Sequence, residues 1–177
     1  MRQDNLFDIF RLFVVLYRIY AFYPPLFVFF FAKSCRNTEV FRQLNNFHLG
    51  KCVYASAFTG EVIIPSSVTY ISSATFTGCA GITAIRVEEG NTKFKAMDGI
   101  LYTIDGKELI NAPRGLVLEN YIIPEGVEKI WDYAFQSCSN ITGTLTFPST
   151  LEIISNTSFT GIVISYIEVA ENNNTFK

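Results

Sequence analysis

The chain has 177 residues, enough for about one domain, and its formal net charge is −2 at pH 7. A sequence pI of about 5.4 excludes a generally basic surface, so we predict no nucleic-acid partner. Charged residues make up 17% of the chain, below the roughly 25% of average domains, and much of the hydrophobic excess lies in the first 32 residues.

Residues 1–35 form a hydrophobic segment of the kind found in secretion signals and membrane anchors, and we predict a helix there. Within residues 12–32 the only charged side chain is Arg18, and a helix of that length would cross a hydrocarbon core of about 30 Å. Arg18 and a pair of prolines argue against a regular transmembrane helix. Three interpretations stay open: an anchor through residues 6–32, a cleaved signal peptide, or upstream sequence that is not native to the domain.

Residues 36–51 are polar and unpatterned, and we predict a linker there. Beyond the linker the sequence repeats one frame. In three copies, beginning at Pro65, Pro124 and Pro148, apolar residues occupy the third, sixth and eleventh positions after the proline. Self-similarity over roughly 20 to 30 residues is typical of a solenoid, in which each unit buries its apolar face against its neighbours. We therefore predict a repeat domain over residues 52–177, with a degenerate first unit.

Each repeat also contains a short strand in which one residue lies between two apolar ones. Five such strands are predicted, over residues 62–64, 85–87, 121–123, 145–147 and 167–169. Alternation along a strand points the flanking residues inward and the middle residue outward. Stacked coil on coil, these strands would form one parallel sheet on a curved face. The outward row is a candidate ligand-contact surface, made of Ile63, Arg86, Ile122, Thr146 and Glu168.

One aromatic residue departs from the repeat frame. Trp131 follows the inward Ile130, where the other two copies have Ser72 and Ser155. A tryptophan that points outward from the wall opposite the strands is a candidate contact residue, because tryptophan is enriched at the energetic centres of protein interfaces. The alternative, in which Trp131 packs against a hairpin insertion, is equally open.

That insertion is predicted over residues 88–120, because the step between the second and third strands is 36 residues and the other steps are 22 to 24. The segments Ile-Leu-Tyr-Thr-Ile at 100–104 and Lys-Glu-Leu-Ile at 107–110 flank an Asp-Gly pair at 105–106, a strong hairpin signal. We assign Asp98 and the aspartate of this pair to turns, because the regular spacing of oxygen ligands in a calcium loop is missing. We predict no metal site and no cofactor.

A ten-residue segment at 86–95 returns at 168–177. The shared Asn91 and Asn173 are expected to hydrogen-bond the backbone of a turn, as asparagine commonly does. The second copy ends where another hairpin would begin, so we expect an incomplete, uncapped carboxy-terminal end.

The four cysteines form no CxxC pair and the only histidine is His48, so we predict no zinc site. Cys79 and Cys138 share one repeat position, which favours burial in the core, with a disulfide as the alternative in a secreted protein. His48 lies in the predicted linker, and no Ser/His/Asp or Cys/His arrangement accompanies it. We therefore predict that the protein is not an enzyme.

The repeat at 123–141, Ile-Pro-x-x-Val-x-x-Ile-x-x-x-Ala-Phe-x-x-Cys-x-x-Ile, resembles the BspA-type leucine-rich repeats, also called the Treponema pallidum type. The block Asn-x-x-Phe…Asp-Gly-Ile-Leu-Tyr…Leu-Ile…Pro at 91–113 is similar to the same family. The resemblance covers residues 61–177. It implies an α/β-type leucine-rich-repeat solenoid, a β-rich horseshoe with the parallel sheet on one face and an inserted β-hairpin.

The resemblance also implies a cell-surface or secreted protein of anaerobic bacteria or parasitic protists, which adheres to host cells, extracellular matrix or other microbes. Its expected partners are proteins, and no catalytic activity is implied. Two alternatives stay open: self-association as a structural module through the solenoid end, and an intracellular scaffold. Asn140, Asn156 and Asn173 begin N-x-Ser/Thr sequons, which would be glycosylation sites in a eukaryotic secretory pathway.

Overall fold

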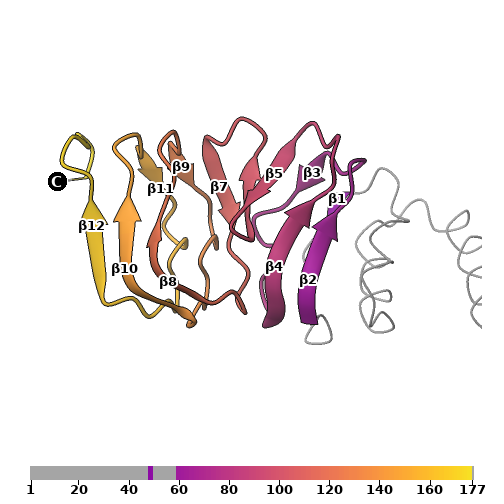
Figure 1. Cartoon of the computed structure of the whole chain (residues 1–177), viewed down its shortest axis with the longest axis horizontal. Coiled ribbons are helices and arrows are strands. Elements are labelled where there is room, and N and C mark those ends of the chain that lie inside the picture. The colour runs from indigo at the N-terminus through magenta and orange to yellow at the C-terminus, as the bar shows by residue number, and fades with distance from the viewer. Residues whose placement is uncertain (1–47, 50–58, 177) are drawn as a thin grey trace, which may run out of the picture.

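The computed structural model describes residues 48–49 and 59–176, which contain twelve strands and no helix (Figure 1). The strands are β1 (His48–Leu49), β2 (Thr59–Ile64), β3 (Tyr70–Ile71), β4 (Gly81–Val87), β5 (Phe94–Met97), β6 (Ile100–Thr103), β7 (Glu108–Asn111), β8 (Leu118–Ile122), β9 (Lys129–Ile130), β10 (Ile141–Phe147), β11 (Ile153–Ile154) and β12 (Tyr166–Val169). The predicted helix within residues 1–35 lies outside the described residues. Among the described residues there is no helix that could span a membrane.

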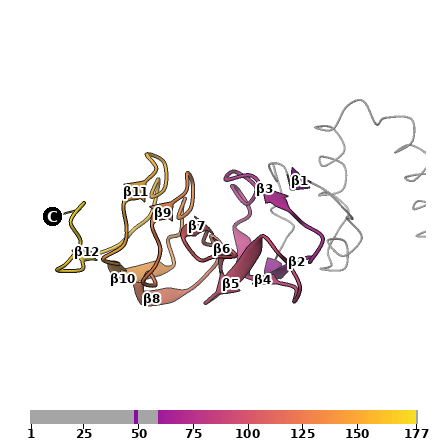
Figure 2. The same cartoon turned by 90° about the horizontal axis from the view of Figure 1, so that it is seen from above.

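Five strands line one side of the solenoid, which we call the sheet face: β2, β4, β8, β10 and β12 (Figures 1 and 2). Each overlaps one of the five predicted strands and begins before it, and β8 ends one residue before the predicted strand does. They form two parallel sheets, because β2 pairs with β4 while β8, β10 and β12 form a separate three-stranded sheet. The expectation of one continuous sheet is therefore wrong. The insertion lies between β4 and β8 along the chain and keeps these two strands from pairing.

The opposite wall is also built of strands, which corrects the expectation of an α/β horseshoe. Here β9 pairs in parallel with β11, and β1 with β3. The segments that follow these strands, such as residues 132–137, are turns too short for a regular helix. Packed helices lie 8–10 Å apart and paired strands about 4.8 Å, so a wall of helices opposite a sheet makes the coils curve. With strands on both walls, the described coils stack along a nearly straight axis (Figures 1 and 2).

Strand β1 lies inside the segment for which a linker was predicted. Its residues His48 and Leu49 pair in register with Tyr70 and Ile71 of β3. The opposite wall thus includes residues upstream of residue 52, where the first repeat was expected to begin. The other residues of the predicted linker lie outside the described part of the chain.

The insertion folds into three antiparallel strands, β5, β6 and β7. The expected hairpin at Asp105-Gly106 connects β6 to β7, and a second turn at Asp98-Gly99 connects β5 to β6. Strand β7 then pairs in parallel with β9, so the insertion continues into the opposite wall. Strand β5 was not predicted, because its sequence Phe-Lys-Ala-Met contains no β-branched residue.

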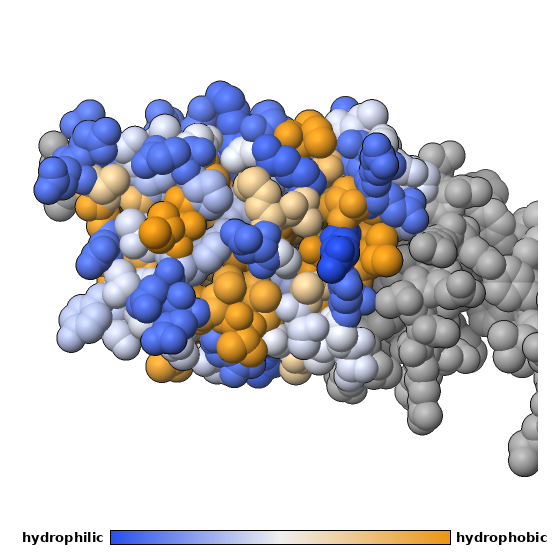
Figure 3. Space-filling model, in the orientation of Figure 1, coloured by the Kyte–Doolittle hydropathy of each residue, from blue (hydrophilic) through white to orange (hydrophobic). Residues whose placement is uncertain are grey.

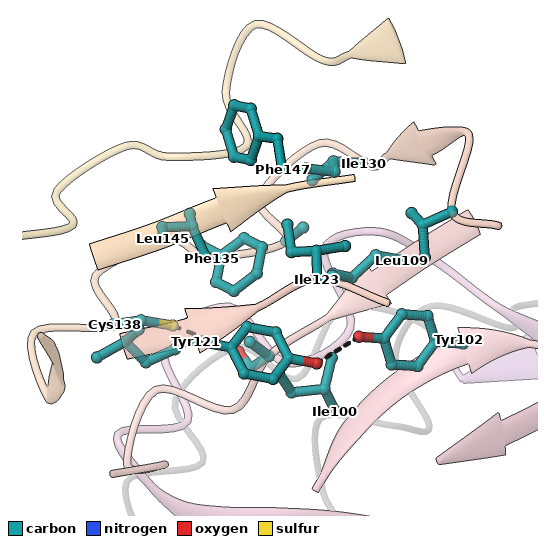
Figure 4. Close-up of a cluster of buried hydrophobic side chains, with 14 of the residues drawn as sticks. Ile100, Tyr102, Leu109, Tyr121, Ile123, Ile130, Phe135, Cys138, Leu145 and Phe147 are labelled. Carbon is teal, nitrogen blue, oxygen red and sulfur yellow. Dashed lines mark hydrogen bonds between the residues drawn. The ribbon is translucent and has the colours of Figure 1, made fainter. Parts of the chain in front are cut away.

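Strands β6 and β7 are buried on both faces and separate two apolar cores. On β6, Ile100 and Tyr102 belong to the core shared with β8, β10 and β12, whereas the intervening Leu101 packs with β2 and β4. Leu109 and Ile110 of β7 divide in the same way. All five side chains are fully buried. In a surface sheet, alternate side chains of a strand face water, whereas here the alternate side chains of β6 and β7 face two different cores. Figure 4 shows the core on the β8 side.

The insertion is also hydrogen-bonded to both halves of the solenoid. On the β4 side, the backbone N–H of Ile85 donates to the carbonyl oxygen of Gly99 at 2.9 Å. On the β9 side, the backbone N–H of Trp131 donates to the carbonyl oxygen of Leu109 at 3.0 Å. These bonds satisfy polar backbone groups that would otherwise be buried without partners where the insertion interrupts the coils.

Asn91 and Asn173 each hold a turn through four hydrogen bonds. The Asn91 amide donates to the carbonyl oxygens of Pro65 and Val68 at 2.9 and 3.1 Å, and its Oδ1 accepts from the backbone N–H groups of residues 93–94, both at 2.8 Å. Asn173 makes the equivalent four bonds in the last repeat. Both side chains are buried. The expectation that these asparagines bind turn backbone is confirmed.

Replacing Asn91 by alanine is expected to lower the free energy of unfolding by about 2–4 kcal/mol, because four hydrogen bonds, three of them buried, are removed at once. Urea unfolding followed by circular dichroism measures the loss. Asn140→Ala is the matched control, because Asn140 is exposed and its removal should change stability by less than about 0.5 kcal/mol. Equal losses in the two variants would contradict the role assigned to Asn91.

A buried pair of tyrosines joins the insertion to β8. The hydroxyl oxygens of Tyr102 and Tyr121 lie 2.7 Å apart in a hydrogen bond (Figure 4). Burial raises the pKa of Tyr121 to about 12, with a smaller contribution from the charge of Asp98 and an opposing one from the bond to Tyr102. Burial, assisted by Tyr121, raises the pKa of Tyr102 further still. Both hydroxyls therefore stay protonated in the folded protein at neutral pH.

This pair should make stability fall at high pH. The folded pKa values lie above the unfolded value of about 10, so the unfolded chain loses these protons first and the stability present below pH 10 is lost as the pH rises toward 12. Urea unfolding at pH 9, 10 and 11 measures the decline. The Tyr102→Phe/Tyr121→Phe variant should decline less steeply, since its other ionisable groups are unchanged. An identical slope in the two proteins would show that the pair does not contribute.

Candidate functional site

The candidate site is the outer surface of the sheet face. Three of the predicted contact residues, Ile122, Thr146 and Glu168, lie in one row across β8, β10 and β12, because they are paired in register. Adjacent strands lie about 4.8 Å apart, so the row is about 10 Å long. Ile122 is 67% exposed, Glu168 is exposed and Thr146 is half-buried. The structure thus brings these three residues together on one surface.

The other two predicted contact residues lie on the second sheet. Ile63 of β2 is paired in register with Arg86 of β4, and the Arg86 guanidinium forms an ion pair with Glu61 on the neighbouring strand. The turn at Gly99 packs beside β4, where a Cβ on Gly99 would lie 3.2 Å from the Cβ of Ala84. The sheet face is therefore divided, and the predicted contact residues fall into a group of three and a group of two.

Sequence reasoning missed several residues on or beside this surface. Thr144 and Tyr166 are paired in register, and Tyr166 is 72% exposed. Each stands two positions before a predicted outward residue, so strand alternation alone could have identified both. Val117, which is 75% exposed, precedes β8 and carries no such signal.

A bulge at Asn120 and Gly143 shapes the lower part of the three-stranded sheet. The pairing of β8 and β10 shifts register here, and the Asn120 Oδ1 accepts a hydrogen bond from the backbone N–H of Thr144 at 3.0 Å. Both bulge residues take a positive φ, and a Cβ on Gly143 would lie 2.3 Å from the Asn120 Oδ1, so this position requires glycine. Bulges re-aim side chains next to binding sites, and Glu119, which is exposed near the start of β8, lies beside this one.

Trp131 lies on the opposite wall and is half-buried. Its indole N–H donates to a carboxylate oxygen of Glu108 on β7, and the Lys129 ammonium lies 5.8 Å from its ring centroid. The indole also packs against the core that contains Leu101 and Ile110 of the insertion. These are the contacts expected of the packing alternative, in which Trp131 holds the insertion. A role of Trp131 in ligand contact stays a prediction.

The three sequon asparagines differ in accessibility. Asn140 and Asn156 are exposed. Asn173 is fully buried, and its amide nitrogen donates to the carbonyl oxygens of Pro148 and Leu151. A glycan on that nitrogen would remove at least one of these bonds and would need space that the folded turn lacks. Asn173 is therefore unsuited to glycosylation once the repeat has folded.

The described residues offer little chemistry for catalysis. They contain no group of three His, Cys, Asp or Glu placed to hold a metal ion. Cys79 and Cys138 are buried and are not joined in a disulfide, which confirms the packing interpretation. The Cys138 thiol donates to the carbonyl oxygen of Ala112 at 3.5 Å, and burial raises its pKa to about 12. A thiol this weakly acidic is a poor nucleophile at neutral pH.

Stacked coils with parallel strands on both walls define a β-solenoid of the leucine-rich-repeat class. The model of the BspA type leucine rich repeat region matches residues 29–97 and 114–177 in six copies, and the chain belongs to this family. The gap between the two matched ranges contains β6 and β7, the strands that separate the cores. No curated protein matches the sequence.

Solved structures with the same fold come from bacteria. The pneumococcal vaccine antigen PcpA is 27% identical with a TM-score of 0.60, over 65% of this chain and 28% of its own. A leucine-rich cell surface protein of Faecalibacterium prausnitzii is 27% identical with a TM-score of 0.55, over 64% and 31%. A leucine-rich repeat protein of Eubacterium ventriosum, at 19% identity and a TM-score of 0.55 over 75% and 40%, shows the fold alone. The chain spans less than half the length of each of these proteins.

Proposed function

We propose that the chain is a non-enzymatic, cell-surface or secreted protein that binds protein ligands through the sheet face. Its partners would be host cells, extracellular matrix or other microbes, and residues 6–32 would anchor it if they are retained. Leucine-rich-repeat proteins generally bind proteins, and this family and fold are typically non-enzymatic. Two of the similar solved structures are a vaccine antigen and a cell surface protein, which supports the surface location.

The observation that carries the proposal is the exposure of Ile122 on a rigid strand. Its neighbours Tyr121 and Ile123 are buried in the core, and β8 is paired along its length with β10. The paired strand therefore fixes the Ile122 side chain in a solvent-exposed orientation. A partner that covers this side chain gains the free energy of burying apolar surface without the cost of ordering a flexible loop. The exposed Tyr166 on β12 adds a second contact residue to the same surface. Its side chain is amphipathic, as is common at interfaces.

The test compares two exposed isoleucines on opposite walls. Ile122 on β8 is 67% exposed and Ile153 on β11 is 52% exposed, so an aspartate at either position should be tolerated by the fold. Biolayer interferometry of the full-length chain against purified extracellular-matrix proteins and whole bacterial or host cells measures binding. Ile122→Asp is expected to weaken binding at least about tenfold, as central interface residues do, while Ile153→Asp leaves binding unchanged.

Equal weakening in both variants would contradict the assignment of the sheet face. The absence of any ligand, together with a mass in light scattering that grows with protein concentration, would favour self-association over adhesion.

A further inference from the structure

The described solenoid is more acidic than the chain as a whole. Residues 59–176 contain 13 acidic and 6 basic side chains, a formal net charge of −7 at pH 7, whereas the full chain carries −2. The balanced total therefore conceals a strongly negative repeat region. A surface of one sign attracts partners of the other sign and repels partners of the same sign.

Two of the six basic side chains in residues 59–176, Lys107 and Lys129, lie near carboxylates of the opposite wall. Lys107 forms an ion pair with Glu128 at 2.6 Å, and Lys129 lies 3.9 Å from a carboxylate oxygen of Glu108. These pairs join β7 and its turn to β9 and its flank. The opposite wall is thus locally close to neutral around its central strands.

The three-stranded part of the sheet face, in contrast, carries a net negative charge. Across β8, β10 and β12 the only charged residues are Glu119 and Glu168, both exposed, and neither forms an ion pair within residues 59–176. Asp98, at the exposed turn between β5 and β6, is a further acidic side chain, and its charge contributes to the raised pKa of Tyr121. The one basic residue on the neighbouring sheet, Arg86, is paired with Glu61.

Apolar and hydroxyl groups lie between these carboxylates. Ile122 is exposed in the centre, and β10 contributes Thr142, Thr144 and Thr146. Figure 3 shows this side of the molecule as a mixture of hydrophobic and hydrophilic patches rather than as one apolar area. Such a surface suits a ligand that also alternates between apolar and charged groups.

From this charge distribution we infer that the sheet face binds an extended, positively charged polypeptide segment, with an apolar side chain on Ile122 and lysine or arginine side chains on Glu119 and Glu168. The inference rests on the proposed function and names the class of its ligand. Glu119 precedes Ile122 by three residues, about 10 Å along β8, and Glu168 lies two strands away, also about 10 Å. Side chains on one face of an extended peptide repeat every 7 Å or so, and lysine and arginine reach several ångström further.

The test uses fluorescence anisotropy of the full-length chain with a labelled ten-residue peptide whose odd positions are alternately lysine and valine and whose even positions are serine, so that lysine and valine share one face of the extended peptide. The lysine peptide is expected to bind, and a matched peptide with glutamate in place of lysine is expected not to bind. The Glu119→Gln/Glu168→Gln variant should weaken binding about five- to tenfold at low salt, and raising the salt concentration should reduce the difference. The control is Glu89→Gln/Glu152→Gln, which changes net charge equally at two exposed residues outside the strands of the sheet face.

Equal losses in the two double variants would show that only net charge matters, and would overturn the inference. The inference would also be overturned if the lysine peptide did not bind while a protein ligand was found whose binding Ile122→Asp weakens. The proposed function would stand in that case. Binding of neutral oligosaccharides alone would likewise overturn the inference. Circular dichroism of each variant confirms that the repeats remain folded.

Discussion

The burial of β6 and β7 on both faces is the constraint on which the rest of the solenoid depends. Leu101 faces the β2–β4 core and its neighbours Ile100 and Tyr102 face the β8–β12 core, so one strand completes both. Within the described residues, the stretches before and after the insertion, 59–87 and 118–176, each have fewer than about 60 residues, a size at which a chain buries only about 60% of its surface and is marginally stable. The insertion therefore unites two small cores into one stable unit, and it also explains why the sheet face is divided.

Much of the repeat architecture could be predicted from the sequence, because the signals are local. Three proline frames, the apolar-x-apolar strands and the Asp-Gly turn each depend on a few neighbouring residues, and Asn91 and Asn173 stand in matching segments. The division of the sheet could not be predicted from the sequence. Alternation shows which side chains point to opposite faces of a strand, but not whether the second face meets water or another core. The absence of helices in the described residues was missed because the family resemblance, rather than any helical periodicity, suggested them.

The candidate surface was predictable only in part for a related reason. Alternation placed Ile122, Thr146 and Glu168 in one outward row, and their register confirms it. Pairings across strands decide the rest: Arg86 is neutralised by Glu61, and Trp131 is bound by Glu108 on an insertion strand more than 20 residues away. The two walls consequently differ in task. On the opposite wall, ion pairs and the Trp131 indole hold the insertion. On the sheet face, an exposed isoleucine and two carboxylates that form no ion pair within residues 59–176 leave the surface available to a ligand.

Hydrogen–deuterium exchange of the native full-length chain tests whether the insertion makes the two halves one cooperative unit. We expect amides of β6 and β7 to be among the slowest to exchange, and those of β4 and β8 to exchange in the same slow class, because all four strands open only on global unfolding. Fast exchange in β6 and β7, or loss of protection in β2–β4 under conditions that leave β8–β12 protected, would contradict it.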